Sequence, residues 1–145
     1  ALVKSINPKV NIIFTVSPVR HLKDGFIENS QSKAHLISAI HNVADKRKQL
    51  FYFPSYEIML DDLRDYRFYN SDMLHPNETA INYIWEQFQS VWINDNTLSI
   101  QKKVDSIQKG LAHKPFNQNS GKHQLFIKSL QQKIDDLIAQ NNISF

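Results

Sequence analysis

Apolar residues recur with a helical period most clearly in the stretch after Pro76. They would form one broad apolar stripe over roughly four turns, and they are Ala80, Ile81, Ile84, Trp85, Phe88, Val91 and Trp92. Asn77 stands just before this stripe and is suited to the N-cap position, because its side chain can accept a hydrogen bond from a free backbone N–H. The pattern predicts a helix from Asn77 to Trp92.

Two short apolar runs predict strands. Residues 10 to 16 are almost continuously apolar, which is typical of a strand buried on both faces in a parallel sheet. Residues 50 to 53 are aromatic and apolar, and Pro54 then removes a donor from the ladder. A helix between the two runs would make a right-handed βαβ unit.

The connecting helix should begin at Ser30 or Ser32, since either serine can act as an N-cap. We expect it to end near residues 46 to 48, where Lys-Arg-Lys would complement the helix dipole. Its apolar face would comprise Ala34, Ile37, Ile40 and Ala44. Shorter helices are expected over residues 1 to 6 and 55 to 63.

After Trp92 the chain changes character. Helices are expected over residues 97 to 111 and, capped by Ser120, over a final segment with apolar residues at helical spacing. Gly110 is expected to interrupt the end of the helix over residues 97 to 111. Residues 101 to 145 hold seven lysines and three aspartates, so this tail supplies the positive balance of a chain with net charge +3. Evenly spaced lysines with few aromatic residues favour a solvated helix face over a nucleic-acid surface. We therefore expect the tail to pack on the body or to form a homo-oligomer.

Composition limits the fold. The chain has 145 residues, only three glycines and two clear strands, which is too few for a complete doubly wound sheet. Either a preceding half of the domain exists in the full protein, or the fold is mostly helical. The opening residues read as a start in mid-domain, and no signal-peptide pattern is visible, which slightly favours a cytoplasmic protein. No apolar run reaches the length of a membrane span.

The segment with the strongest chemical signal is Asp72-Met73-Leu74-His75-Pro76. A carboxylate can fix the tautomer of an imidazole, which can then act as a general base. Pro76 holds His75 in an extended backbone, so the segment should be a loop before a helix. Read alone, the motif fits a cap better than a catalytic pair.

Together with two companion motifs, this segment resembles the last block of the SGNH hydrolase superfamily. The companions are the segment Ser17-Pro18-Val19-Arg20-His21 and the strand end at residues 52 to 57, and they narrow the resemblance to the GSCFA branch. It covers about residues 10 to 92. The resemblance implies a three-layer α/β/α domain that hydrolyses or transfers an ester-linked acyl group, with a carbohydrate ester or another small molecule as substrate.

The catalytic residues that the resemblance implies are His75 as general base and Asp72 as its partner. The serine segment that gives the branch its name does not occur in the sequence, and the cysteine count is zero. Residues 1 to 95 would thus be the C-terminal part of the hydrolase domain, inactive alone, and residues 96 to 145 a helical extension.

Further candidates for the site lie at the carboxyl ends of the two strands, where open α/β sheets bind ligands. As substrate or oxyanion contacts we expect Ser17, Arg20, His21, Tyr56 and Glu57. No cofactor is expected, and no metal site either, because no pair of histidines has ligand spacing. The competing hypothesis is a non-catalytic helical interaction module, in which Asp72 and His75 are structural.

Overall fold

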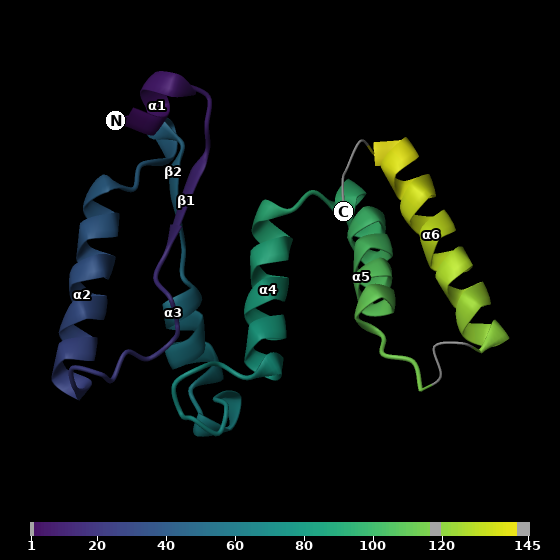
Figure 1. The fold of residues 1–145 in the computed structure, drawn as a ribbon. Coiled ribbons are helices and arrows are strands. Elements are labelled where there is room, and N and C mark those ends of the chain that lie inside the picture. Colours follow the sequence, from purple (N-terminus) through teal and green to yellow (C-terminus); the bar gives the residue numbers. More distant parts are fainter. Residues whose placement is uncertain (1, 117–119, 142–145) are drawn as a thin grey trace. The chain divides into compact units, whose positions relative to one another are not determined.

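The structure is a computed structural model that describes residues 2–116 and 120–141. The chain divides into two compact units, Ala1–Trp92 and Ile93–Phe145. The first unit is mixed α/β and the second is a pair of helices (Figure 1). We describe each unit by itself.

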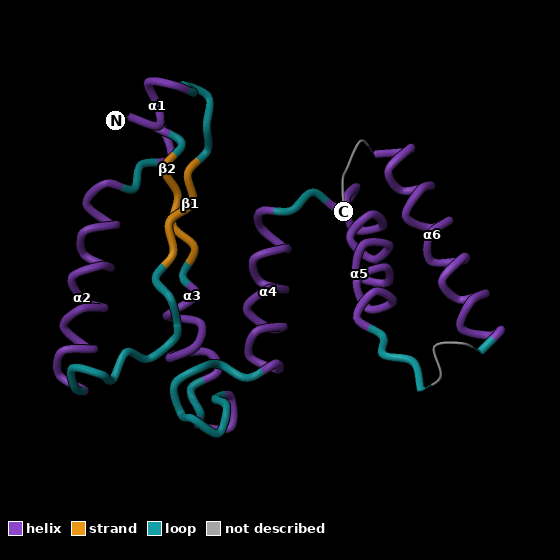
Figure 2. The backbone as a smooth tube through the Cα atoms, viewed as in Figure 1, coloured by secondary structure: helices purple, strands orange, loops and turns teal. Residues whose placement is uncertain are grey.

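Two parallel strands form the centre of the first unit, side by side in Figure 2. β1 (Ile12–Thr15) pairs with β2 (Leu50–Phe53), and Ile12 lies opposite Leu50 in the register. Both predicted strands are confirmed, although β1 is shorter than expected. In the described part of the chain the sheet has only these two strands, so a full three-layer sheet is not seen.

The helix that connects the strands begins earlier and ends earlier than the sequence predicted. α2 (Phe26–Val43) starts directly after Gly25, whose φ of 115° is suited to glycine. Ser30 lies inside the helix and donates its hydroxyl to the carbonyl of Phe26 (3.0 Å), so the predicted serine cap was wrong. The basic segment forms a separate turn, η1 (Lys46–Lys48), because Ala44 leaves the helix with extended backbone angles.

The helix after the Asp-x-x-His segment agrees with its prediction. α4 (Glu78–Trp92) is capped by Asn77, whose side-chain oxygen accepts from the Ala80 amide (3.1 Å). Its aromatic residues pack against alternate residues of β2. The ring centroids of Phe53 and Phe88 are 5.1 Å apart, and those of Phe51 and Trp92 are 5.0 Å apart.

Tyr52, which lies between Phe51 and Phe53 in β2, points to the opposite face of the sheet. Tyr52 contacts His41 of α2 with a centroid distance of 4.9 Å. Because successive side chains of a strand point to opposite faces, α2 and α4 cover opposite faces of the two-stranded sheet (Figure 1). The remaining elements of this unit are short: α1 (Leu2–Ile6), α3 (Ser55–Glu57), the π-helical η2 (Ile58–Leu63) and the 3₁₀ turn η3 (Tyr66–Phe68).

The second unit is a helical hairpin that follows the short turn η4 (Asp95–Thr97). α5 (Leu98–Ala112) packs on α6 (Gly121–Asn141), and the buried residues of this contact are Ile107, Leu130 and Leu137. The Ser120 hydroxyl accepts from the amide of His123 (3.2 Å), so the predicted cap is confirmed. Gly110 does not interrupt α5, because the helix continues to Ala112.

Candidate functional site

The Asp-x-x-His loop is closed on itself by backbone hydrogen bonds. The Asn70 amide donates to the His75 carbonyl (2.8 Å), and Tyr69 pairs with Pro76 as an antiparallel bridge. The Met73 amide donates to the Asn70 carbonyl (2.9 Å), and Met73 has a φ of 61°. These contacts give the loop a defined backbone conformation although it lacks regular secondary structure.

Within this loop Asp72 and His75 are in direct contact. One carboxylate oxygen of Asp72, Oδ2, lies 2.7 Å from Nδ1 of His75. The other, Oδ1, accepts from the amides of Leu74 (2.8 Å) and His75 (3.0 Å). The amides of Leu74 and His75, followed by the imidazole, lower the pKa of Asp72 to about 2, so it is ionised at neutral pH.

The imidazole of His75 contacts Asp72 through one of its two nitrogens, Nδ1. The His75 side chain is 56% exposed, and within residues 2–116 and 120–141 no hydrogen-bond partner is found for Nε2. An Nδ1–H that donates to Asp72 leaves the Nε2 lone pair available to accept a proton. The arrangement is therefore chemically suited to general-base catalysis.

Arg20 connects the end of β1 to this loop. Its amide donates to the Leu74 carbonyl (3.0 Å), and its guanidinium donates to the Met73 carbonyl (2.9 Å). The guanidinium also lies 5.8 Å from the ring centroid of Tyr69. Arg20 thus holds the backbone of Met73 and Leu74, the two residues between Asp72 and His75.

The other predicted contacts are distributed around the strand ends. Tyr56 shares a cavity with Arg20. The Tyr52 hydroxyl donates to the carboxylate of Glu57 and lies 2.8 and 2.9 Å from its two oxygens. In the described residues no hydrogen bond joins Glu57, Ser17 or His21 to the Asp72–His75 pair.

Ser17 and His21 have partners nearby in the sequence. The Ser17 hydroxyl accepts from the Val19 amide (3.2 Å), and Nε2 of His21 lies 3.2 Å from Asp24. Both residues are exposed. Their role as substrate contacts stays a prediction.

The model of the GSCFA family matches residues 1–88, more than half of the chain. The chain belongs to the GSCFA family. A second model, described as the GSCFA domain protein C-terminal domain, matches residues 104–145. Searches of curated proteins and of solved structures gave no match. The resemblance that the motifs indicated is thereby confirmed at the level of the family.

The structure of this GSCFA chain adds two residues that the sequence interpretation missed. Lys33 is buried, and its ammonium donates to the Ser17 carbonyl (2.7 Å). Ser55 is also buried and donates to the Val16 carbonyl (2.7 Å), which joins the ends of the two strands. Lys33 stands four residues before Ile37 on the inner face of α2, and this spacing was a signal that could have found it.

Two further findings concern metal binding and membrane-spanning helices in this GSCFA chain. Within residues 2–116 and 120–141, no three His, Cys, Asp or Glu side chains gather where they could hold a metal ion. No helix in the same residues has the length and apolar character that crossing a membrane requires.

Proposed function

We propose that this GSCFA chain supplies the base of a serine-dependent esterase or acyltransferase of the SGNH type. His75 is the general base, Asp72 orients it, and the nucleophilic serine belongs to a segment outside residues 1–145. The substrate would be an ester-linked acyl group on a carbohydrate or another small molecule. The observation that carries the proposal is the 2.7 Å contact between Asp72 Oδ2 and His75 Nδ1, in a side chain that is 56% exposed and whose Nε2 has no hydrogen-bond partner among the described residues.

The proposed reaction uses Nε2 twice. In the first step the serine oxygen attacks the ester carbonyl, and its proton passes to Nε2 of His75. The imidazolium, stabilised by the ionised Asp72, then gives this proton to the departing alcohol as the carbon–oxygen bond breaks. A water molecule, or an acceptor alcohol in transfer, next attacks the acyl-serine with the same help, and the serine regains its proton.

An open apolar groove supports the idea of a further segment. The groove has a volume of about 450 Å³, lies between β1, β2 and α4, and reaches Pro76, the neighbour of His75. Two of its residues remain strongly exposed, Ile81 at 56% and Trp85 at 47%. A large exposed apolar surface usually marks a contact with another structural element. We propose that the serine-bearing part of the domain covers this groove and extends the two-stranded sheet, which would complete a three-layer α/β/α domain.

The test is hydrolysis of a short-chain aryl ester by the full-length protein, after mass spectrometry has confirmed the serine-bearing segment. General-base catalysis contributes typically 10²- to 10⁴-fold, so His75→Ala should lower kcat/KM at least about a hundredfold. His35→Ala, on the exposed side of α2, is the matched control and should keep the activity. Equal activity of His75→Ala and the parent protein would exclude His75 as the base.

A second function, a non-catalytic interaction module, is favoured by a different observation. α6 keeps large apolar side chains exposed although it packs on α5, among them Leu125 at 68% and Ile127 at 46%. These residues could contact a second copy of the chain, while Asp72 would merely cap its loop. Labelling by a fluorophosphonate probe distinguishes the two functions, since only the esterase carries an activated serine.

A further inference from the structure

A cavity beside the Asp-x-x-His loop has a chemical character of its own. Its volume is about 390 Å³, and its lining residues come from the start of α2, from α3 and from the segment between α3 and α4. Its polar lining includes three cations and three tyrosines, which are Arg20, Lys33, Arg64, Tyr56, Tyr66 and Tyr69. The sequence interpretation identified only Arg20 and Tyr56 among them.

The cavity has an excess of positive charge. Its single carboxylate, Asp65, is engaged by the guanidinium of Arg67 (3.1 Å) and by the Arg67 amide (2.8 Å). No carboxylate in the described residues forms an ion pair with Arg20, Lys33 or Arg64. Lys33 is 8% exposed, so it is a buried cation without a counter-charge. Burial lowers the pKa of Lys33, and a bound anion would offset this cost.

The tyrosines define the rest of the binding surface. The Lys33 ammonium lies 5.6 Å from the ring centroid of Tyr56, and the Arg20 guanidinium lies 5.8 Å from that of Tyr69. The hydroxyls of Tyr56, Tyr66 and Tyr69 have no hydrogen-bond partner among the described residues. A tyrosine side chain combines an apolar ring face with a hydroxyl that can donate and accept hydrogen bonds. This combination suits a ligand with a hydroxylated ring.

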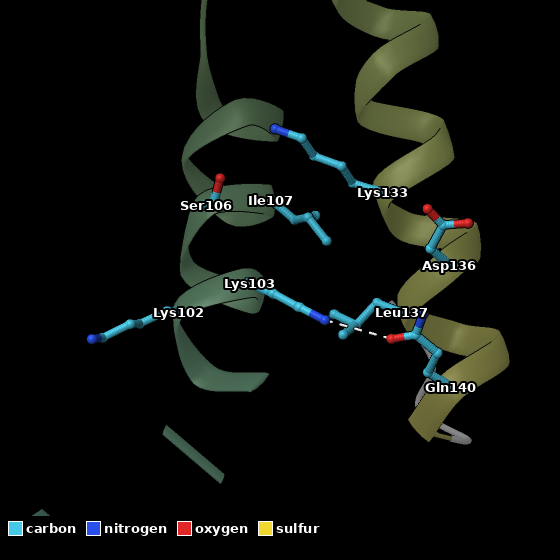
Figure 3. A pocket seen from close by; sticks show the side chains of 8 residues that line it. All are labelled: Lys102, Lys103, Ser106, Ile107, Lys133, Asp136, Leu137 and Gln140. Carbon is cyan, nitrogen blue, oxygen red and sulfur yellow. Dashed lines mark hydrogen bonds between the residues drawn. The ribbon is translucent and has the colours of Figure 1, made fainter. Parts of the chain in front are cut away.

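The second unit contains a comparable groove that lacks this convergence. It has a volume of about 440 Å³ and includes Lys102, Lys103 and Lys133 (Figure 3). Lys103 reaches Gln140 of the facing helix (3.5 Å), whereas Lys102 points away from that helix in Figure 3. The cations of the first cavity are therefore the better candidates for an anion site.

We propose that the cavity bounded by Arg20, Lys33 and Arg64 binds the acidic group of a sugar acid or sugar phosphate, with the sugar ring against the tyrosines. Arg20 and Tyr69 also contact the loop that carries His75, the first through Met73 and the second through Pro76. The role of this sugar in the reaction rests on the proposed function. If that function holds, the acidic sugar is the portion of the ester substrate that is held beside His75.

Isothermal titration of the full chain with glucose, glucuronate and glucose 6-phosphate at low salt tests the binding. The three probes share the ring, so at least one acidic sugar should bind at least tenfold more tightly than glucose. Glucuronate and glucose 6-phosphate together show whether a carboxylate or a phosphate is preferred. Equal binding of all three would overturn the proposal, and inorganic phosphate binding as tightly as glucose 6-phosphate would overturn the sugar part.

Arg64→Asn locates the site. Arg64 is exposed and has a φ of 52°, a conformation that asparagine tolerates, so the variant removes a charge without a new backbone strain. We expect at least fivefold weaker binding of the acidic sugar, and Lys9→Gln, which removes an exposed charge elsewhere, should change nothing. Unchanged binding in Arg64→Asn would contradict the proposal. His75→Ala should bind normally, so a failure of catalysis and a failure of binding are separately visible.

Discussion

Replacing Asp72 with asparagine separates the two roles of one side chain. The amide oxygen of asparagine can still accept from the Leu74 and His75 amides, as Oδ1 does now at 2.8 and 3.0 Å. The amide NH₂ would stand where Oδ2 now faces Nδ1 of His75 at 2.7 Å. Because NH₂ can only donate, Nδ1 must become the acceptor and the ring proton must move to Nε2. The loop should keep its conformation and lose its base.

The size of the effect follows from this change of tautomer. In a Ser-His-Asp triad whose Asp is buried, a wrong histidine tautomer lowers kcat about 10⁴-fold. Here the His75 side chain is 56% exposed, so water can compete for the ring nitrogens and restore part of the active form. We therefore expect the lower end of the general-base range, a loss of about a hundredfold in kcat for Asp72→Asn.

Two measurements check this prediction. Long-range ¹H–¹⁵N NMR at a pH where the ring is neutral should show the His75 proton on Nδ1 in the parent chain and on Nε2 in Asp72→Asn. Asp24→Asn is the matched control, since Asp24 contacts His21 at the same sequence separation, and it should leave His75 unchanged. A proton that stays on Nδ1 in Asp72→Asn would refute the reasoning, and so would an aryl-ester rate that does not fall in the full-length variant.

Two further predictions concern stability. The pKa of Asp72 is about 2 in the folded chain and near 3.9 when unfolded, so its stabilisation of the loop is complete above about pH 5. This stabilisation should be lost as the pH falls toward 2, so the protection of the His75 amide against exchange should decrease more in the parent chain than in Asp72→Asn. An equal pH dependence in the two proteins would contradict this. A methyl group at Gly110 would lie 2.7 Å from Leu130, which is 5% exposed. Overpacking costs about 1–3 kcal/mol and the gain in helix propensity is about 1 kcal/mol, so Gly110→Ala should destabilise the hairpin in urea by up to about 2 kcal/mol. Gly121→Ala, with nothing within 4 Å, should not destabilise it.

Local chemistry was predictable where neighbours in the sequence decide it. Asn77 and Ser120 cap their helices because a cap bonds an amide only a few residues away. The Asp72–His75 contact is of the same local kind, since three residues of turn bring the two side chains together. The start of α2 was missed because both Gly25 and Ser30 are acceptable local signals, and only the observed backbone chooses between them.

The tertiary structure decided which distant residues share a site. Arg20 and Met73 are separated by 53 positions, and their hydrogen bond exists only because β1 ends beside the loop before α4. The burial of Lys33 also depends on packing, as helical periodicity assigns a face to a residue but does not say what covers that face. The sequence therefore determined the elements and the Asp72–His75 pair, whose contacts are local. The cationic cavity required the fold, because it is assembled from segments that no periodicity or motif connects.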